Sequence, residues 1–176
     1  MTRHSRHKMT GGGHRRGLGV TPLVAAAAVL GTGLTLVLAV IAAEPGGVIG
    51  ARMQLVKDLA FARNASMQGQ RDTYVVVFDV DAQRWHVAAA AKPGKPVLRP
   101  NGTPRQMDLN EGQWQGVALS ITAMGNDDRI GFGAFGQLDQ RTDAMVLLST
   151  EQEDVEIRVS AQDGLTAWRS IDRSAD

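Results

Sequence analysis

The chain has 176 residues, with 19 lysines and arginines against 18 aspartates and glutamates, and no cysteine. The lack of cysteine excludes disulfide bonds, thiolate nucleophiles and cysteine-based metal sites. The charge is unevenly distributed: residues 1–43 hold five basic and no acidic residues, and the rest, with 14 basic against 18 acidic residues, carries −4. A mildly acidic segment is a poor ligand for polyanions, so we expect no nucleic-acid partner.

Residues 1–16 form a basic tail, and residues 17–43 follow it without a single charged residue. A helix over most of this apolar stretch is long enough to cross the roughly 30 Å hydrocarbon core of a bilayer. We therefore predict a cytoplasmic leader or tail at 1–16, one transmembrane helix at 17–43 and an exported head at 44–176. The positive-inside rule gives this orientation, with the basic tail inside and the head outside.

A cleaved signal peptide is the alternative interpretation of the same stretch. It would release the head into the periplasm, and the Arg15-Arg16 pair even suggests a twin-arginine signal. The hydrophobic part of a signal peptide usually runs about 7 to 15 residues, which is shorter than residues 17–43. A retained anchor is therefore favoured. Within it, the small residues Gly31 and Gly33 would let other transmembrane helices approach closely.

Residues 49–70 are predicted to form an amphipathic helix, the spine on which the strands of the head pack. At about 100° per residue, one broad face collects most of the apolar side chains. The predicted core residues of this face are Val56, Leu59, Ala62 and Met67, beside Ile49, Met53, Leu55 and Ala60. Arg52 and Arg63 project from the same face, and we expect their heads to reach solvent or a carboxylate. Gly69 is expected to end the helix, and an aspartate in place of Leu59 or Val56 is expected to unfold the head.

The sequence between residues 73 and 171 alternates as short strands do. Residues 73–80 and 84–90 predict one hairpin, and residues 154–160 and 165–171 predict another around an Asp-Gly turn. Further strands are predicted at residues 106–109, 117–124, 129–135 and 144–149, whereas residues 92–104, with four prolines, read as a loop. About six to eight strands behind one amphipathic helix predict an α+β fold with antiparallel sheet.

No active site is visible in the sequence. Residues 131–136 match the letters of the dinucleotide motif G-x-G-x-x-G, but no helix is predicted directly after them, as the phosphate contact requires. His86 is the only histidine of the head, so a multi-histidine metal site cannot form. The acid pairs Asp79 with Asp81 and Asp127 with Asp128 are explained by turn formation. We therefore predict no catalytic, cofactor-binding or metal-binding residue, and a protein that is not an enzyme.

Four stretches, taken in order, carry a resemblance to a known family. Arg15-Arg16-Gly17 precedes the apolar run, residues 55–70 form the helix after it, and residues 73–85 and 130–140 provide an early and a late hairpin. In this order the chain resembles the type IV pilin-like proteins. More specifically, it resembles the H-type minor pseudopilin of type II secretion and the related FimT-type minor pilins. The resemblance covers most of the chain after the basic tail.

The resemblance implies a pilin-like fold and contacts with other pilins or pseudopilins through the anchor helix and the head. It further implies that the single helix spans a bacterial inner membrane, with the N-terminus in the cytoplasm and the head in the periplasm. It also implies that prepilin peptidase cuts after Gly17, so that Leu18 becomes a methylated N-terminus. The family places a glutamate five residues into the mature chain, whereas this sequence has Pro22 there. That glutamate is thought to pair with a neighbouring N-terminal amine inside the membrane, where an unpaired charge is expensive.

The sequence thus leads to three hypotheses for function. The first is a minor pseudopilin of a type II secretion system, anchored in the membrane and working in protein export. The second is a FimT-type minor pilin of a type IV pilus, acting in pilus assembly or in DNA uptake, which would require a basic patch on the head. The third is a soluble periplasmic protein released from a signal peptide.

Overall fold

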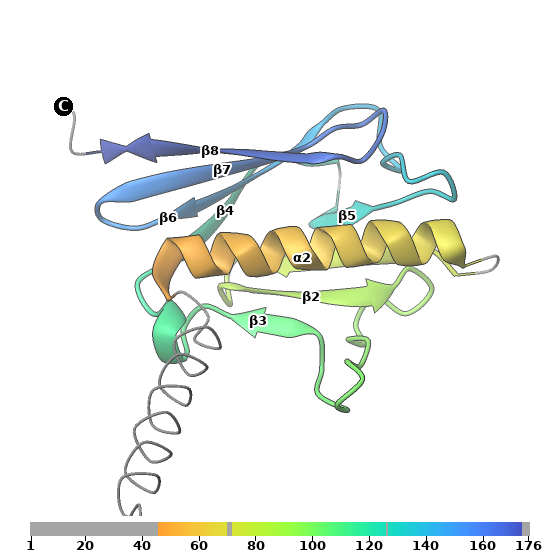
Figure 1. The fold of residues 1–176 in the computed structure, drawn as a ribbon, viewed down its shortest axis with the longest axis horizontal. Helices are drawn as coiled ribbons and strands as arrows, with labels where there is room; N and C mark the ends of the chain where they lie inside the picture. Colours follow the sequence, from red (N-terminus) through yellow and green to blue (C-terminus); the bar gives the residue numbers. More distant parts are fainter. Residues whose placement is uncertain (1–45, 70–71, 126, 174–176) are drawn as a thin grey trace, which may run out of the picture. The chain divides into compact units, whose positions relative to one another are not determined.

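The computed structural model describes residues 46–69, 72–125 and 127–173, which contain a helix followed by eight strands (Figure 1). The basic tail at 1–16 and the transmembrane helix predicted at 17–43 lie outside the described residues. With them lie the predicted cleavage residues Gly17 and Leu18 and the packing residues Gly31 and Gly33. Among the residues that the structure describes, no helix is both long and apolar enough to cross a membrane.

The helix α2 runs over Gly47–Gln68, shifted by two residues from the prediction. Gly69 is its C-cap, and the backbone N–H of Gly69 donates to the carbonyl of Ala65 at 2.8 Å. A Cβ at Gly69 would lie only 2.8 Å from the carbonyl oxygen of Asp72, so the chain turns here at a point that leaves no room for a side chain. The prediction that Gly69 ends the helix is therefore confirmed.

Eight strands form two antiparallel sheets of four strands each, which confirms the predicted α+β fold. The first sheet has the order β3-β2-β1-β5 and contains β1 (Tyr74–Asp79), β2 (Arg84–Ala89), β3 (Gln106–Asp108) and β5 (Arg129–Gly131). The second has the order β4-β6-β7-β8 and contains β4 (Ala118–Ala123), β6 (Ala144–Ser149), β7 (Glu153–Val159) and β8 (Thr166–Asp172). A 3-10 turn, η1, spans Gly112–Trp114. Helix α2 contacts both sheets, with β6 to β8 on one side of it and β2 and β3 on the other (Figure 1).

The alternation of apolar residues decides which side of each strand faces the helix. In β6, Ala144, Val146 and Leu148 are buried and the residues between them are only half-buried. In β7, Val155, Ile157 and Val159 are buried in the same way. Because successive strand residues point to opposite faces, this period of two places one apolar face of the second sheet against α2.

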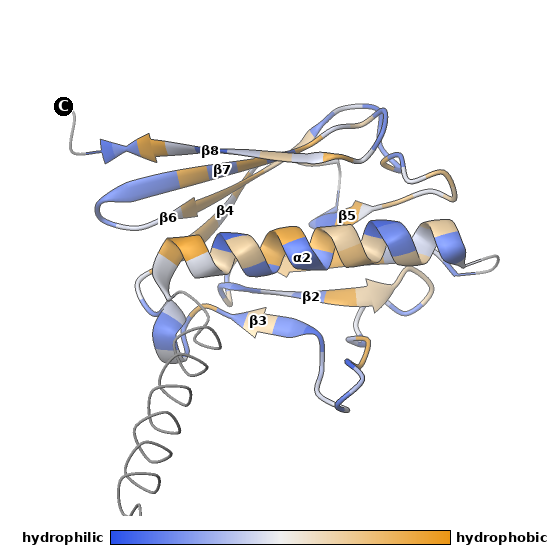
Figure 2. Ribbon diagram, viewed as in Figure 1, coloured by the Kyte–Doolittle hydropathy of each residue, from blue (hydrophilic) through white to orange (hydrophobic). Residues whose placement is uncertain are grey.

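The buried face of α2 differs from the predicted one. Leu59 and Ala62 are fully buried, but Val56 is half-buried, and Met67 is 47% exposed, so its placement in the core was wrong. Gln54 and Asp58, which are polar, are buried instead. The helix is thus turned away from the orientation that its apolar residues alone favour, and hydrophobic residues interrupt the hydrophilic ones along its visible face (Figure 2).

A side-chain amide connects the two sheets. Gln83 lies in the β1–β2 turn with a φ of 52°. Among the described residues it is the one non-glycine residue with a positive φ. Its Nε2 donates to the carbonyl of Leu119 in β4 at 3.1 Å, and its Oε1 accepts the backbone N–H of Leu119 at 2.6 Å. The amide therefore binds the outer edge of β4 as a strand residue would.

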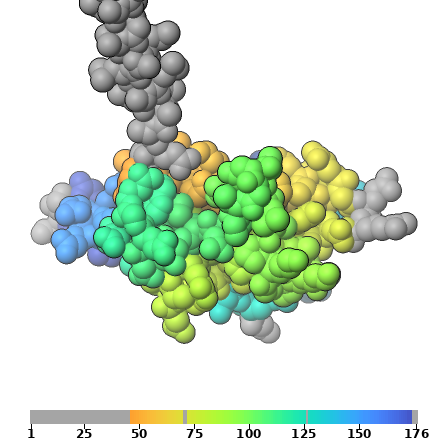
Figure 3. All heavy atoms as spheres, turned by 90° about the horizontal axis from the view of Figure 1, so that it is seen from below, coloured from red at the N-terminus to blue at the C-terminus, as the bar shows by residue number. Residues whose placement is uncertain are grey.

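The segment after β5 forms a tight loop and not the strand predicted at residues 129–135. β5 ends at Gly131, and Phe132 bridges Leu138 across the loop. A Cβ at Gly131 would lie 2.0 Å from a carboxylate oxygen of Asp139, which explains the glycine by close approach. In the described part of the chain no helix follows residues 131–136, so the dinucleotide reading fails. The predicted loop at 92–104 and η1 cover much of the face shown in Figure 3.

Carboxylates close several of the turns. Asp143, just before β6, accepts the backbone N–H of Ala161 at 2.8 Å and the Nε of Arg158 at 2.7 Å. These two interactions, the backbone bond first, hold the pKa of Asp143 below its usual value. In the β7–β8 turn, the backbone N–H of Leu165 and the hydroxyl of Ser160 likewise lower the pKa of Asp163.

We predict that Leu59→Asp unfolds the head, because it places a charge where the side chain is fully buried. The matched variant Val56→Asp, three residues earlier on the same helix, is expected to fold, because Val56 is half-buried. This replaces the expectation that both substitutions unfold the head. Circular dichroism and protease resistance of the full-length chain in detergent measure the difference. A folded Leu59→Asp protein would contradict this assignment of the core.

We also predict that Asp143→Asn reduces the loss of folding stability between about pH 6 and about pH 3. Because the pKa of Asp143 is lower in the folded than in the unfolded chain, its contribution is present above about pH 4 and is lost as the pH falls through the folded-state pKa. Denaturation midpoints at about pH 6 and about pH 3 should therefore differ less in the variant than in the parent. Asp81→Asn, which removes an exposed carboxylate elsewhere, is the control and should leave the difference unchanged.

Candidate interaction surface

Apolar side chains line the outer face of α2. Ile49, Met53, Ala60 and Met67 are exposed and Val56 is half-buried. Ile49, Met53, Val56 and Ala60 are spaced by three or four residues, and Met67 follows seven residues later, so that all five lie in one stripe along the helix. We call these five residues the outer stripe. Exposed apolar residues are ordinary when single, whereas a continuous row of them marks a surface that another molecule can cover.

Two arginines beside the outer stripe attach α2 to the second sheet. The guanidinium of Arg52 lies 3.7 Å from the ring centroid of Trp168 in β8, a cation–π contact. The Nε of Arg63 donates to the carbonyl of Asp163 at 3.0 Å and to that of Gly136 at 3.3 Å. Their partners are thus a ring and two carbonyls, whereas the sequence suggested solvent or a carboxylate.

A shallow depression of about 240 Å³ lies where the outer stripe meets β8. It is lined by Arg52, Met53, Val56, Lys57 and Trp168. Trp168 is 52% exposed, which leaves a large ring on the surface next to apolar helix residues. Exposed tryptophan and arginine side chains of this kind often contribute most to protein–protein contacts.

A buried carboxylate sets the orientation of α2 and therefore of the outer stripe. Asp58 is fully buried, and its Oδ2 accepts two hydrogen bonds at 3.1 Å, from Nε1 of Trp85 in β2 and from Nε2 of Gln54 one turn earlier. Its Oδ1 accepts Nη1 of Arg105 at 2.9 Å. We call Gln54, Asp58, Trp85 and Arg105 the Asp58 junction. It fixes one face of α2 against the first sheet.

The cation of the Asp58 junction is also packed against the helix. The Arg105 guanidinium lies 3.9 Å from the ring centroid of Phe61, and the Arg105 side chain is only 17% exposed. Sequence reasoning missed this junction, although one signal was present. Asp58 is the only acidic residue of α2 and lies between Leu55 and Leu59, where a carboxylate requires a partner if the face is buried.

The acidic and histidine side chains that were considered as metal ligands form turn contacts and ion pairs in the structure. Asp79 accepts the N–H of Ala82 at 3.0 Å and pairs with Arg84 at 2.7 Å, and these contacts lower the pKa of Asp79. A ring nitrogen of His86 lies 2.7 Å from the carbonyl oxygen of Pro93. Among the described residues, no three histidine or acidic side chains gather in a group that could hold a metal ion.

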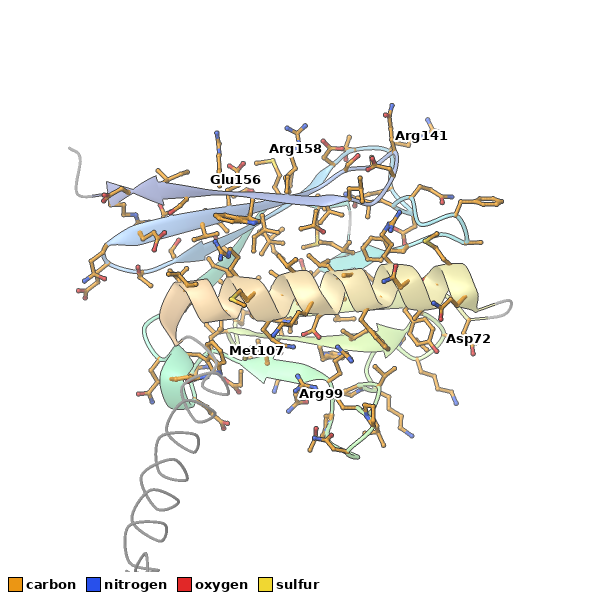
Figure 4. All side chains as sticks on the ribbon, viewed as in Figure 1. Asp72, Arg99, Met107, Arg141, Glu156 and Arg158 are labelled. Carbon is orange, nitrogen blue, oxygen red and sulfur yellow. The ribbon has the colours of Figure 1, made fainter. Side chains whose placement is uncertain are left out.

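The outer face of the second sheet carries charges of both signs in pairs. Glu156 and Arg158 lie on the side of β7 that faces away from α2 (Figure 4). Arg158 pairs with Asp143 at 2.5 Å, and Arg169 of β8 pairs with Glu156 at 2.9 Å. Each of these two exposed arginines thus lies beside a carboxylate.

No protein-family model matches the sequence, and no curated protein matches it. Among solved structures, the minor pseudopilin EpsH from the type 2 secretion system of Vibrio cholerae is similar, with 13% identity over 72% of this chain and 96% of that chain and a TM-score of 0.50. The type IV minor pilin FimU of Pseudomonas aeruginosa matches with 15% identity over 69% of this chain and 87% of that chain, at a TM-score of 0.49. The resemblance to the pilin-like proteins is confirmed at the level of the fold.

We predict that Asp58→Ala destabilises the head by about 3–5 kcal/mol, because it leaves Arg105 and the indole N–H of Trp85 without their acceptor. Replacing both ions, as in Asp58→Leu with Arg105→Met, should recover the part of this loss that comes from the unpaired Arg105, while the indole N–H of Trp85 still lacks its acceptor. Arg84→Ala, which breaks an exposed ion pair, is the control and should change stability by less than about 1 kcal/mol. Denaturant unfolding measures all three. Equal effects of Asp58→Ala and Arg84→Ala would show that the junction does not hold the fold.

Proposed function

We propose that the protein is a non-enzymatic minor subunit of a membrane-rooted pilin-like assembly, of the kind that serves type II protein secretion. The single observation that carries this proposal is the outer stripe of α2 on a pilin-like head. A helix that packs one face on two sheets and presents a second apolar row to solvent is built for contact with further protein.

The similar structure supports a role in a pilin-like assembly. EpsH, which shares the fold, is a minor pseudopilin of a type 2 secretion system. In our proposal this chain occupies a comparable place: residues 17–43 anchor it in the inner membrane, the tail stays in the cytoplasm and the head lies in the periplasm. Other pilins or pseudopilins contact the anchor, partly at Gly31 and Gly33, and the head at the outer stripe.

Substitutions in the outer stripe test this role. Met53→Glu combined with Met67→Glu should abolish co-purification of other pilin-like subunits from detergent-extracted membranes, because each adds a charge to an apolar contact. Gln152→Glu combined with Gln162→Glu adds the same two charges at exposed turn positions away from α2 and should leave co-purification intact. The identity of the co-purifying subunits distinguishes a secretion system from a type IV pilus. Equal co-purification by both double variants, or none by the parent, would reject the proposal.

Processing of the N-terminus is tested by intact mass and N-terminal sequencing of the membrane-extracted protein. A start at Leu18, with or without methylation, would support cleavage by prepilin peptidase after Gly17. A start at Met1 would leave an anchored subunit that the peptidase does not process. Recovery of the head in the soluble fraction with a start near residue 43 would instead support a released periplasmic protein and contradict the membrane-rooted role.

A further inference from the structure

β8 is an edge strand of the second sheet and pairs with β7 along its whole length, from Thr166 opposite Val159 to Asp172 opposite Glu153. After Thr166 each of its residues is exposed. β8 contains no proline, and the register between β7 and β8 runs without a bulge. It therefore lacks two of the devices that usually prevent an edge strand from pairing with another strand.

The hydrogen-bond pattern shows which backbone groups of β8 point outward. At one end the N–H of Ser160 donates to the carbonyl of Leu165, and at the other the N–H of Arg173 donates to that of Gln152. In an antiparallel pair such bonded positions alternate, so Ala167, Arg169 and Ile171 bond to β7. The N–H and C=O groups of the alternate residues point away from the sheet. These outward residues are Thr166, Trp168, Ser170 and Asp172.

The opposite edge of the same sheet is closed. The backbone N–H and C=O of Leu119 in β4 are both bound by the side-chain amide of Gln83, and the β4–β6 register shifts between Ile121 and Ala123. A bound edge with an irregular register cannot accept another strand. The sheet is thus protected on the β4 side and left available on the β8 side.

We propose that β8 of one chain pairs antiparallel with β8 of a second copy, in a two-fold arrangement centred on Ser170. In this register Ser170 lies opposite Ser170 of the second copy, and Trp168 lies opposite Asp172. Because the outward backbone groups of these residues face each other, the pairing continues the sheet across two molecules. The two four-stranded sheets become one sheet of eight strands.

Side-chain contacts disfavour the registers centred on Arg169 and on Trp168. Centring the pair on Arg169 would place two arginines directly opposite each other, which is destabilising. Centring it on Trp168 would bring together the two rings and the Arg52 cations that lie 3.7 Å above them. Centring it on Ser170 places the carboxylate of Asp172 beside Trp168 and Arg52 of the other chain, because Trp168 and Asp172 share one face of β8. It also places Arg169 opposite Ile171.

The pairing has a geometric consequence for assembly. A two-fold axis perpendicular to the sheet makes the two α2 helices run in opposite directions. An assembly in which all heads point the same way cannot contain this pair, so the dimer is a form of the subunit outside such an assembly. It depends on β8 and not on the outer stripe, so it stands independently of the proposed function.

The lack of cysteine in the chain allows a clean crosslinking test. In the full-length protein in mild detergent, Ser170→Cys should form a disulfide-linked dimer under mild oxidation. The paired Cα atoms would lie about 5.5 Å apart, within the disulfide range of about 4.4–6.8 Å. Thr166→Cys is the matched control on the same edge, because its two copies would lie about 27 Å apart. Equal crosslinking of the two variants, or a disulfide between Thr166→Cys and Ser170→Cys chains that exceeds that of Ser170→Cys alone, would overturn the register.

Two further variants test the backbone pairing and the charge contact by sedimentation of the cysteine-free protein. Ser170→Pro removes an outward N–H and should leave a monomer, whereas Ser170→Ala, which keeps the N–H and loses the same hydroxyl, should dimerise. Arg52→Glu should weaken the dimer at least about tenfold, and adding Asp172→Arg should restore it. Dimers of Ser170→Pro as strong as those of Ser170→Ala, monomeric parent protein at all concentrations, or β8 crosslinking only to a different polypeptide would overturn the proposal.

Discussion

The arrangement of the head depends on one buried carboxylate. A charged aspartate in an apolar interior is unfavourable by several kcal/mol unless hydrogen bonds and an opposite charge compensate it. Asp58 receives both, from Arg105, Trp85 and Gln54. These donors come from the segment before β3, from β2 and from α2 itself, so a single rotation of the helix satisfies all of them together. The junction therefore selects which side of α2 faces the sheets, a choice that hydrophobic packing alone would leave open.

That rotation divides the apolar residues of α2 between two faces. Leu55, Leu59 and Ala62 enter the core, while Ile49, Met53 and Met67 remain outside. Because both faces hold apolar residues, helical periodicity could not tell the core side from the contact side, and the prediction for Met67 failed for this reason. The information that decides the rotation lies in Trp85 and Arg105, far along the chain from Asp58. Only the folded chain brings these residues together.

The features predicted correctly from the sequence are those set by local chemistry. The hairpin around Asp163-Gly164, the β1–β2 hairpin and the end of α2 at Gly69 each follow from residues next to one another in the chain. The features missed depend on distant contacts. Gly131, the last residue of β5, lies against Asp139, and the backbone of Leu119 in β4 is bound by a glutamine from the β1–β2 turn. A candidate interaction surface is of the second kind, since exposure is a property of the whole fold.

The contact surfaces of the head lie next to each other, and this adjacency has a physical origin. Arg52 projects from α2 beside the outer stripe and covers Trp168 of β8, so the helix surface and the open strand edge meet at one cation–π contact. On the opposite edge, Gln83 binds β4 and removes its backbone groups from intermolecular pairing. The two candidate contact surfaces of the head therefore lie along α2 and β8, and Arg52 of α2 connects these two elements through its contact with Trp168.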